Sequence, residues 1–342
     1  MQNYQHLTPE ERAVIMIELR AESSLRSIGK LLNRSASTIS RELSRNQNQH
    51  SVDYCASAAG QQYKVNRQRS RKRAKLIPGT FLYEQVKEWL VHNQWSPMQI
   101  SGTLYRHFPD QVNMQVSHET IYASIYAHPK NELKRQMIQA LRRSKRKRGP
   151  RGTKDSNYSS LKIAEDQFIH HRPEEINERR FPGHWEGDLI VGAMNRSCIG
   201  TVVERKTGFV ILSKMKSKSA ASVRAGFERQ MKKLPAFLRL SMTYDRGAEM
   251  AQHPIMSKNL KMKIYFADPH APWQRGSSEN INGLLRQYLP KGEDLSQYSQ
   301  ATLNKIAWLL NTRPRERFNF RTPQELIETV LEDHLNSVAL ES

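Results

Sequence analysis

Three acidic residues in the carboxyl-terminal half of the sequence have positions that suit metal-dependent chemistry. Asp188 lies in an apolar segment, where a carboxylate is costly to bury unless it is paired or holds a cation. Asp245 closes a later β-rich segment, and Glu279 opens a helical segment with 33 residues between the two acids. Carboxylate oxygens are the ligands that Mg²⁺ and Mn²⁺ prefer. We expect Asp188, Asp245 and Glu279 to converge as catalytic residues that hold two such ions for an in-line phosphoryl displacement.

The residues around Glu279 add polar groups on the same side of the predicted helix. Asn282 and Arg286 follow Glu279 by three and seven residues, which places them on one helix face. We expect both to contact DNA, together with Arg275 just before the helix. Gly276 leaves room for close approach of a backbone or a phosphate. The alternative interpretation is a surface helix with ordinary polar residues.

An alternating series of strands and helices must position these acids. Predicted strands cover 184–191, 197–204, 209–215, 241–245 and 263–267, and predicted helices cover 219–233, 249–260 and 277–288. Three consecutive strands, then helix, strand, helix, strand and helix, is the element order of a ribonuclease-H-like α/β domain. A lone aspartate at a strand end is more often a cap or a surface group, so the metal-site prediction depends on the combination.

The amino-terminal segment has the pattern of a helix-turn-helix. Thr8 suits the cap of a first helix, and two more helices are predicted at 25–32 and 35–45 around a turn at Asn33. The last helix buries apolar residues at spacings of three and four and turns a polar face outward. The DNA contacts expected from this helix are Ser37, Thr38, Arg41 and Arg45. Such side chains suit the major groove, whereas the alternative is a plain helical hairpin with a solvated face.

A second helical segment follows the same plan less clearly. Ser96 and Pro97 predict a helix start, and Ser117 predicts the cap of another helix. The DNA contacts expected from that second helix are His118, Thr120 and Tyr122. A structural three-helix packing unit is the alternative.

Positive charge is concentrated at the front of the chain. The sequence carries 54 basic and 33 acidic residues, a formal charge of +21. Residues 1–154 hold 27 of the basic and 11 of the acidic residues, a net charge of +16. This excess favours a polyanion, usually nucleic acid, over a merely soluble basic protein. We expect the basic runs at 64–75 and 142–154 to be solvated and to follow the DNA backbone without reading sequence.

These patterns predict a multidomain chain, with an all-α helix-turn-helix amino-terminal part followed by an α/β ribonuclease-H-like, integrase-type catalytic domain. The expected divisions are a helix-turn-helix DNA-binding domain at 1–50, a basic connecting segment at 51–79, a second helical DNA-binding domain at 80–140, a basic linker at 141–180, and the catalytic domain with carboxyl-terminal helices at 181–342. Two distant cysteines, Cys55 and Cys198, predict neither a disulfide framework nor a zinc signature. The sequence lacks a run of 18 apolar residues, so we expect no membrane association and a cytoplasmic location.

Four segments resemble one known family, the insertion sequence thirty family of bacterial DDE transposases. They are RSASTISREL at 34–43, PWQRGSSENINGLLR at 272–286, LPKG at 289–292 and NTRPR at 311–315. The resemblance implies that Asp188, Asp245 and Glu279 form the DDE triad and that Arg286 is the basic residue two helical turns beyond the glutamate. It also implies the fold of retroviral integrases without their zinc module.

The sequence therefore predicts a DNA transposase. We expect it to bind the terminal inverted repeats of its own insertion element and a target DNA, both double-stranded. With two Mg²⁺ or Mn²⁺ ions it should cleave and join strands as a homodimer or larger homo-oligomer. The alternatives are a sequence-specific DNA-binding regulator with an inactive integrase-like domain and a ribonuclease-H-like nuclease that cuts without joining.

Overall fold

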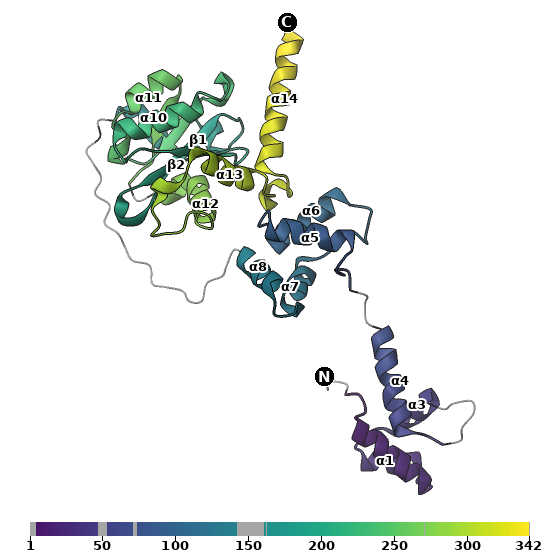
Figure 1. The fold of residues 1–342 in the computed structure, drawn as a ribbon. Helices are drawn as coiled ribbons and strands as arrows, with labels where there is room; N and C mark the ends of the chain where they lie inside the picture. The colour runs from purple at the N-terminus through teal and green to yellow at the C-terminus, as the bar shows by residue number, and fades with distance from the viewer. Residues whose placement is uncertain are drawn as a thin grey trace. The chain divides into compact units, whose positions relative to one another are not determined.

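The computed structural model describes residues 5–46, 53–70, 74–141, 161, 163–269 and 271–341. The chain divides into two compact units, Met1–Ala74 and Lys75–Ser342 (Figure 1). The predicted basic run at 142–154 lies outside the described residues, as do residues 71–73 of the run at 64–75.

The first unit contains the predicted helix-turn-helix. Its helices are α1 (Pro9–Arg20), α2 (Leu25–Leu31), α3 (Ala36–Asn46) and α4 (Ala56–Arg69). Thr8 and Glu11 form a reciprocal capping box at the start of α1, which confirms the predicted cap. Asn33 has a φ of 52°, the left-handed conformation expected at the turn between α2 and α3. One apolar side chain from each of α1, α2 and α3 closes the core together with Leu7, which precedes α1: they are Ile15, Ile28 and Ile39.

Helix α4 lies where we expected only a connecting segment over 51–79. The helix packs against α1, with Ala59 buried and the Tyr63 ring beneath the guanidinium of Arg12 at 4.9 Å from the ring centroid. Its sequence has few large apolar residues, so periodicity gave no signal for it. The helix extends the first unit beyond residue 50.

The second unit begins with four helices around a small core of their own. They are α5 (Phe81–Val91), α6 (Pro97–His107), α7 (His118–Ala127) and α8 (Glu132–Ala140). Ser96 caps α6 in a capping box with Gln99, and Ser117 caps α7, as predicted. The Trp89 and Trp95 rings stack at 4.9 Å beside this core.

A five-stranded mixed sheet follows. Its strands are β1 (His184–Val191), β2 (Cys198–Glu204), β3 (Val210–Lys214), β4 (Ser241–Tyr244) and β5 (Lys263–Phe266), in the order β3-β2-β1-β4-β5. The first three strands pair antiparallel, whereas β1 with β4 and β4 with β5 pair parallel. This topology confirms the predicted ribonuclease-H-like α/β domain.

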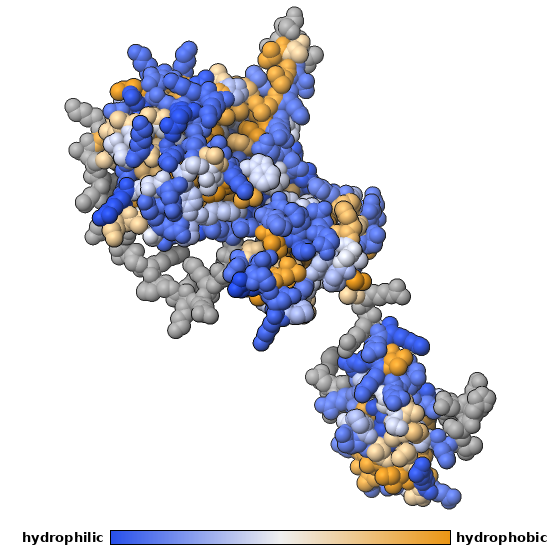
Figure 2. Space-filling view, in the orientation of Figure 1, coloured by the Kyte–Doolittle hydropathy of each residue, from blue (hydrophilic) through white to orange (hydrophobic). Residues whose placement is uncertain are grey.

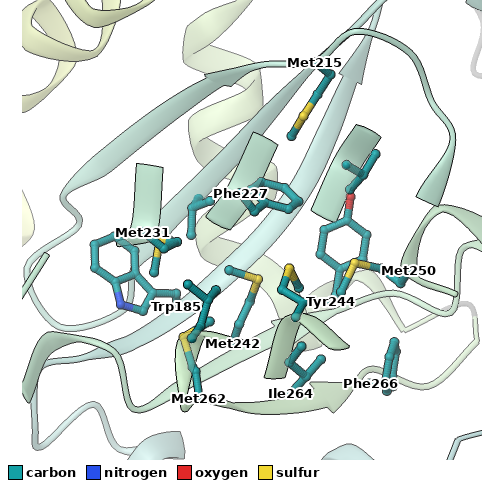
Figure 3. Packing of buried hydrophobic residues seen from close by; sticks show 14 of the residues in the cluster. Trp185, Met215, Phe227, Met231, Met242, Tyr244, Met250, Met262, Ile264 and Phe266 are labelled. Atoms are coloured by element: carbon teal, nitrogen blue, oxygen red, sulfur yellow. The ribbon is translucent and has the colours of Figure 1, made fainter. Parts of the chain in front are cut away.

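One face of the sheet is covered by α10 (Ala220–Met231) and α11 (His253–Leu260). Figure 3 shows the apolar packing on this face, where Phe227 of α10 lies among side chains of the sheet. Trp185 on β1 and Tyr244 on β4 are both fully buried here. Gly187 on β1 permits this packing, because a Cβ there would lie 2.7 Å from the Tyr244 ring.

The other face is covered by α12 (Gly276–Leu285) and α13 (Gln300–Asn311). Successive side chains of a strand point to opposite faces, so Glu186, Asp188 and Ile190 of β1 share this second face. Ile190 packs with Leu284 and Leu285 of α12, which fixes the helix against the strand. The sheet therefore presents Asp188 to α12.

Shorter elements and a last helix complete the unit. They are α9 (Glu174–Asn177), α14 (Pro323–Glu341) and single 3₁₀ turns that include η5 (Ala248–Met250) and η6 (Pro272–Arg275). Leu335 and Val338 of α14 are exposed, and Figure 2 shows hydrophobic atoms along this helix. Within the described residues, no helix has the length and apolar character needed to cross a lipid bilayer.

Candidate active site and nucleic-acid interface

Asp188 is held by three neighbours on the face of β1 that α12 covers. Its Oδ1 accepts a hydrogen bond from its neighbour's backbone, Leu189 N, at 2.8 Å. Its Oδ2 accepts one from the Asn282 side-chain amide at 2.7 Å. Arg275 Nη1 lies 3.6 Å from Oδ1. Burial raises the pKa of Asp188, and the positive charge of Arg275 opposes that rise.

Asp245 lies beside Asp188 because their strands are parallel neighbours. Glu186 of β1 is paired with Thr243 of β4. Asp188 follows Glu186 by two residues, and Asp245 follows Thr243 by two residues, so the two aspartates lie side by side. Asp245 Oδ2 is 3.2 Å from Arg275 Nη2. Asp245 Oδ1 is buried and has no hydrogen-bond partner in the structure. One carboxylate oxygen at this edge of the sheet is therefore left for a cation.

Arg275 bridges the two aspartates with one guanidinium. Its Nη1 also donates to the carbonyl of Gly187 at 3.4 Å. Burial opposes the charge on Arg275, but the negative charges of Asp188 and Asp245 outweigh burial and raise its pKa. In this structure Arg275, which we expected to contact DNA, is engaged by the carboxylates.

Glu279 stands apart from the two aspartates. It is exposed in the first turn of α12, one turn before Asn282 and on the same helix face. Across the described part of the chain, no group of three or more His, Cys, Asp and Glu side chains is gathered as a metal site. The structure thus brings together Asp188 and Asp245, with Asn282 and Arg275, and leaves the convergence of Glu279 a prediction.

The residues present fit a divalent cation. The Asp188 and Asp245 carboxylates share the single positive charge of Arg275. The buried Oδ1 of Asp245 accepts no hydrogen bond, and this costs free energy unless a ligand contacts that oxygen. Oxygen donors of this kind suit Mg²⁺ and Mn²⁺.

Arg286 lies at the far end of α12. Its guanidinium donates to the carbonyls of Leu289 and Val191 at 3.3 and 3.4 Å, so it joins the end of the helix to the end of β1. Burial lowers its pKa. The expected phosphate contact of Arg286 stays a prediction.

Two further acids at this site had no role assigned from the sequence. Glu249 in η5 is half-buried, and its burial together with the nearby charge of Asp245 raises its pKa. Glu186 is fully buried on the same face of β1 as Asp188. The sequence signal that could have identified Glu186 is its spacing from Asp188, since residues two apart on a strand share a face.

The expected recognition residues of α3 lie on its outer face. Ser37, Arg41 and Arg45 are exposed, and Thr38 is half-buried. The Arg41 guanidinium donates to the Ser37 hydroxyl at 3.3 Å, one helical turn earlier. These positions leave the face available, and the DNA contacts themselves stay predictions.

The expected contacts of α7 are less exposed. His118, Thr120 and Tyr122 are all half-buried. His118 lies 3.3 Å from Glu119, and the Thr120 hydroxyl is 2.9 Å from that of the cap, Ser117. Their role in DNA binding stays a prediction.

Comparison with known proteins places the chain in a family. A helix-turn-helix domain family model matches residues 3–46. The chain is 48% identical over 328 residues to the transposase for insertion sequence element IS1086 of Cupriavidus metallidurans, covering 96% of each chain. It is 40% identical over 324 residues to the transposase InsI for insertion sequence element IS30A of Escherichia coli, covering 94% of this chain and 83% of that relative.

Two more similarities extend over different lengths. The transposase for insertion sequence element IS4351 of Bacteroides fragilis is 32% identical over 98% of this chain and 99% of its own. A crystal structure of the catalytic core domain of BIV integrase covers 44% of this chain and 98% of its own, at 20% identity and a TM-score of 0.35. From the full-length relatives, the chain belongs to the IS30 family of insertion-sequence transposases.

Proposed function

We propose that this protein binds the terminal inverted repeats of its own insertion element and catalyses metal-dependent DNA strand cleavage and strand transfer there. The observation that carries the proposal is that Asp188 of β1 and Asp245, directly after the parallel strand β4, lie around the Arg275 guanidinium, with Asp245 Oδ1 unpartnered. Clustered carboxylates of this kind at strand ends serve phosphoryl transfer in two-metal sites.

Asp188, Asp245 and Glu279 would hold two Mg²⁺ or Mn²⁺ ions, which would activate the attacking hydroxyl and stabilise the departing 3′ oxygen. The chain's own task is positioning. Asn282 fixes the Asp188 carboxylate by its hydrogen bond, and the Thr201 hydroxyl donates to Asn282 Oδ1 at 3.2 Å. Glu279 shares the helix face of Asn282, so we propose that its side chain rotates to bring its carboxylate toward Asp188 when cations bind.

Arg275 changes partner in this proposal. Its single positive charge offsets part of the negative charge of the two aspartates. If cations were held by the carboxylates, they would repel the Arg275 guanidinium, which would then be available to a DNA phosphate, for which a guanidinium is well suited.

The helix-turn-helix supplies recognition. Residues Ser37, Thr38, Arg41 and Arg45 of α3 would enter the major groove of the inverted repeat, and the basic segments would add contacts to phosphates. Joining two element ends calls for at least two active sites, so we propose a homodimer or larger homo-oligomer on DNA, in the bacterial cytoplasm.

The test uses the full chain, Mg²⁺ and labelled DNA carrying the element's terminal repeats. Wild-type protein should give both nicked and joined products. Asp245→Asn should abolish cleavage while repeat binding stays nearly unchanged, because an amide cannot replace a charged metal ligand. Nicks without joining favour a nuclease, and binding without either product favours a regulator. A mutant that cuts at the wild-type rate removes Asp245 from the site.

A further inference from the structure

Glu186 uses its two carboxylate oxygens on different parts of the fold. Oε2 accepts hydrogen bonds from the backbone amides of Ser277 and Ser278 at 2.9 and 3.0 Å. Oε1 pairs with Nη1 of Arg205, which lies directly after β2. The side chain is fully buried. A single carboxylate thus joins β1, the end of β2 and the first turn of α12.

The contact with α12 is of a kind that fixes a helix along its axis. The first amides of a helix have no partner within it, and its N-terminus carries partial positive charge. Ser277 and Ser278 stand in the first turn of α12, immediately before Glu279. A carboxylate that accepts hydrogen bonds from both amides therefore fixes the position of Glu279, along the axis of α12, relative to β1.

That same strand carries Asp188 two residues later, on the same face. Asn282, one turn beyond Glu279, reaches Asp188 itself. Glu279 consequently lies between two ties of α12 to β1, one through Glu186 and one through Asp188.

Arg205 completes the arrangement. Its Nε donates to the Ile176 carbonyl at 3.3 Å, and its side chain is almost fully buried. Buried charged pairs contribute little net stability compared with apolar residues of similar volume, whereas an isolated buried charge is very costly. The pair is better explained by the geometry that it imposes than by the free energy of folding that it adds.

We propose that Glu186 is a positioning residue for catalysis, which docks the start of α12 on β1 and so sets the separation between the Glu279 and Asp188 carboxylates. This inference rests on the proposed function. Glu186 does not touch DNA or cations in this role; it acts through the backbone of α12.

The experiment compares Glu186→Gln with Glu204→Gln in the full chain. Glu204 is a matched control, since it is equally buried on the adjacent strand and accepts hydrogen bonds from Gly183 and Thr207 rather than from α12. An amide at 186 keeps an acceptor for one side but places a donor against the other. Displacement of a reacting group by about 1 Å can cost on the order of 100-fold in rate.

We expect Glu186→Gln to slow single-turnover cleavage by on the order of 100-fold and to raise the Mg²⁺ concentration needed for half-maximal cleavage. Repeat binding should stay at the wild-type level. Amide hydrogen exchange at Ser277 and Ser278 should accelerate without a matching change elsewhere in the sheet. Glu204→Gln should change stability alone, with wild-type Mg²⁺ dependence.

Equal rates for the two variants, each corrected for its folded fraction, would overturn the positioning role. If Glu186→Gln does not fold, Glu186→Asp keeps the charge but shortens the reach to α12, and a wild-type Mg²⁺ dependence in that variant would overturn the inference as well. Failure of the proposed function is separate, because it shows as absence of cleavage by the wild-type chain.

Discussion

Two buried glutamate–arginine pairs, one in each compact unit, hold a functional helix in different ways. In the helix-turn-helix unit, Glu42 of α3 meets Arg12 of α1, with Arg12 Nε 2.7 Å from Glu42 Oε1. In the catalytic domain, Glu186 meets Arg205 and also the backbone of α12. The first pair contacts α3 through a side chain in the middle of that helix, whereas the second contacts the backbone amides at the start of α12.

The difference matches what each helix must do. Arg41 of α3, for which we predict a DNA contact, is long and exposed, so its side chain could adjust to DNA after a small shift of the helix. The role proposed for Glu279, that of a metal ligand, would allow only a short reach and a narrow range of useful distances. A hydrogen bond to backbone amides allows less sliding of a helix than a contact between two side chains, which suits the role that we propose for α12.

Breaking the first pair should have the largest effect on stability. In Arg12→Ala, Glu42 keeps a hydrogen bond from Tyr54 but loses its cation, and such unpaired buried charges cost about 3–5 kcal/mol. In calorimetry we expect the first unit to unfold at a lower temperature, while the unfolding temperature of the second unit stays unchanged. Binding to the terminal repeats should be lost.

The control for that experiment replaces both partners by apolar residues, Arg12→Met with Glu42→Leu. This double variant should recover most of the stability, since no buried charge is left alone. An unshifted first transition in Arg12→Ala would contradict a role for the pair in holding α3.

A smaller effect is expected on the outer face of α3. Arg41→Ala should weaken binding to the terminal repeat by about 1–3 kcal/mol if its guanidinium contacts a base. Competition binding against random DNA of equal length measures this. Equal loss on both DNAs would make Arg41 a phosphate contact.

The smallest effect concerns Arg275, whose bridge to the aspartates is partly exposed and therefore exchangeable. Arg275→Gln should tighten Mn²⁺ binding by the DNA-free protein about tenfold, because charged hydrogen bonds worth about 1.5–3 kcal/mol, weakened here by solvent, no longer compete. Titration calorimetry provides the measurement.

Arg246→Gln is the matched control. Arg246 follows Asp245 but pairs with Asp268 at 2.9 Å, outside the bridge. Its variant should bind Mn²⁺ as the wild type does. Unchanged or weaker Mn²⁺ binding in Arg275→Gln would show that the guanidinium does not occupy the cation position.

The sequence was sufficient for features that depend on local pattern. Capping residues such as Thr8 and Ser117, the turn at Asn33 and the succession of strands and helices along the chain could be predicted, because each follows from short-range spacing. That Asp188 and Asp245 lie near each other is predicted from the combination of acids and the element order, and the pairing of β1 with β4 is what brings them together.

Contacts made by the backbone could not be predicted in this way. Glu186 meets amides 91 and 92 residues away, and amides carry no signature of residue type. Arg275 illustrates a related limit: a guanidinium suits both a phosphate and a carboxylate, and only the fold shows that the Asp188 and Asp245 carboxylates lie within its reach.

The division of the candidate site between a sheet and a separately docked helix has an evolutionary consequence. Two of the acids come with the folded sheet, whereas the third depends on how α12 is seated. Under the proposed function, a copy of the element with a substitution where α12 docks would encode a chain that still binds the repeats and no longer cuts them. Such a copy would compete with its active siblings and restrain their spread through the genome.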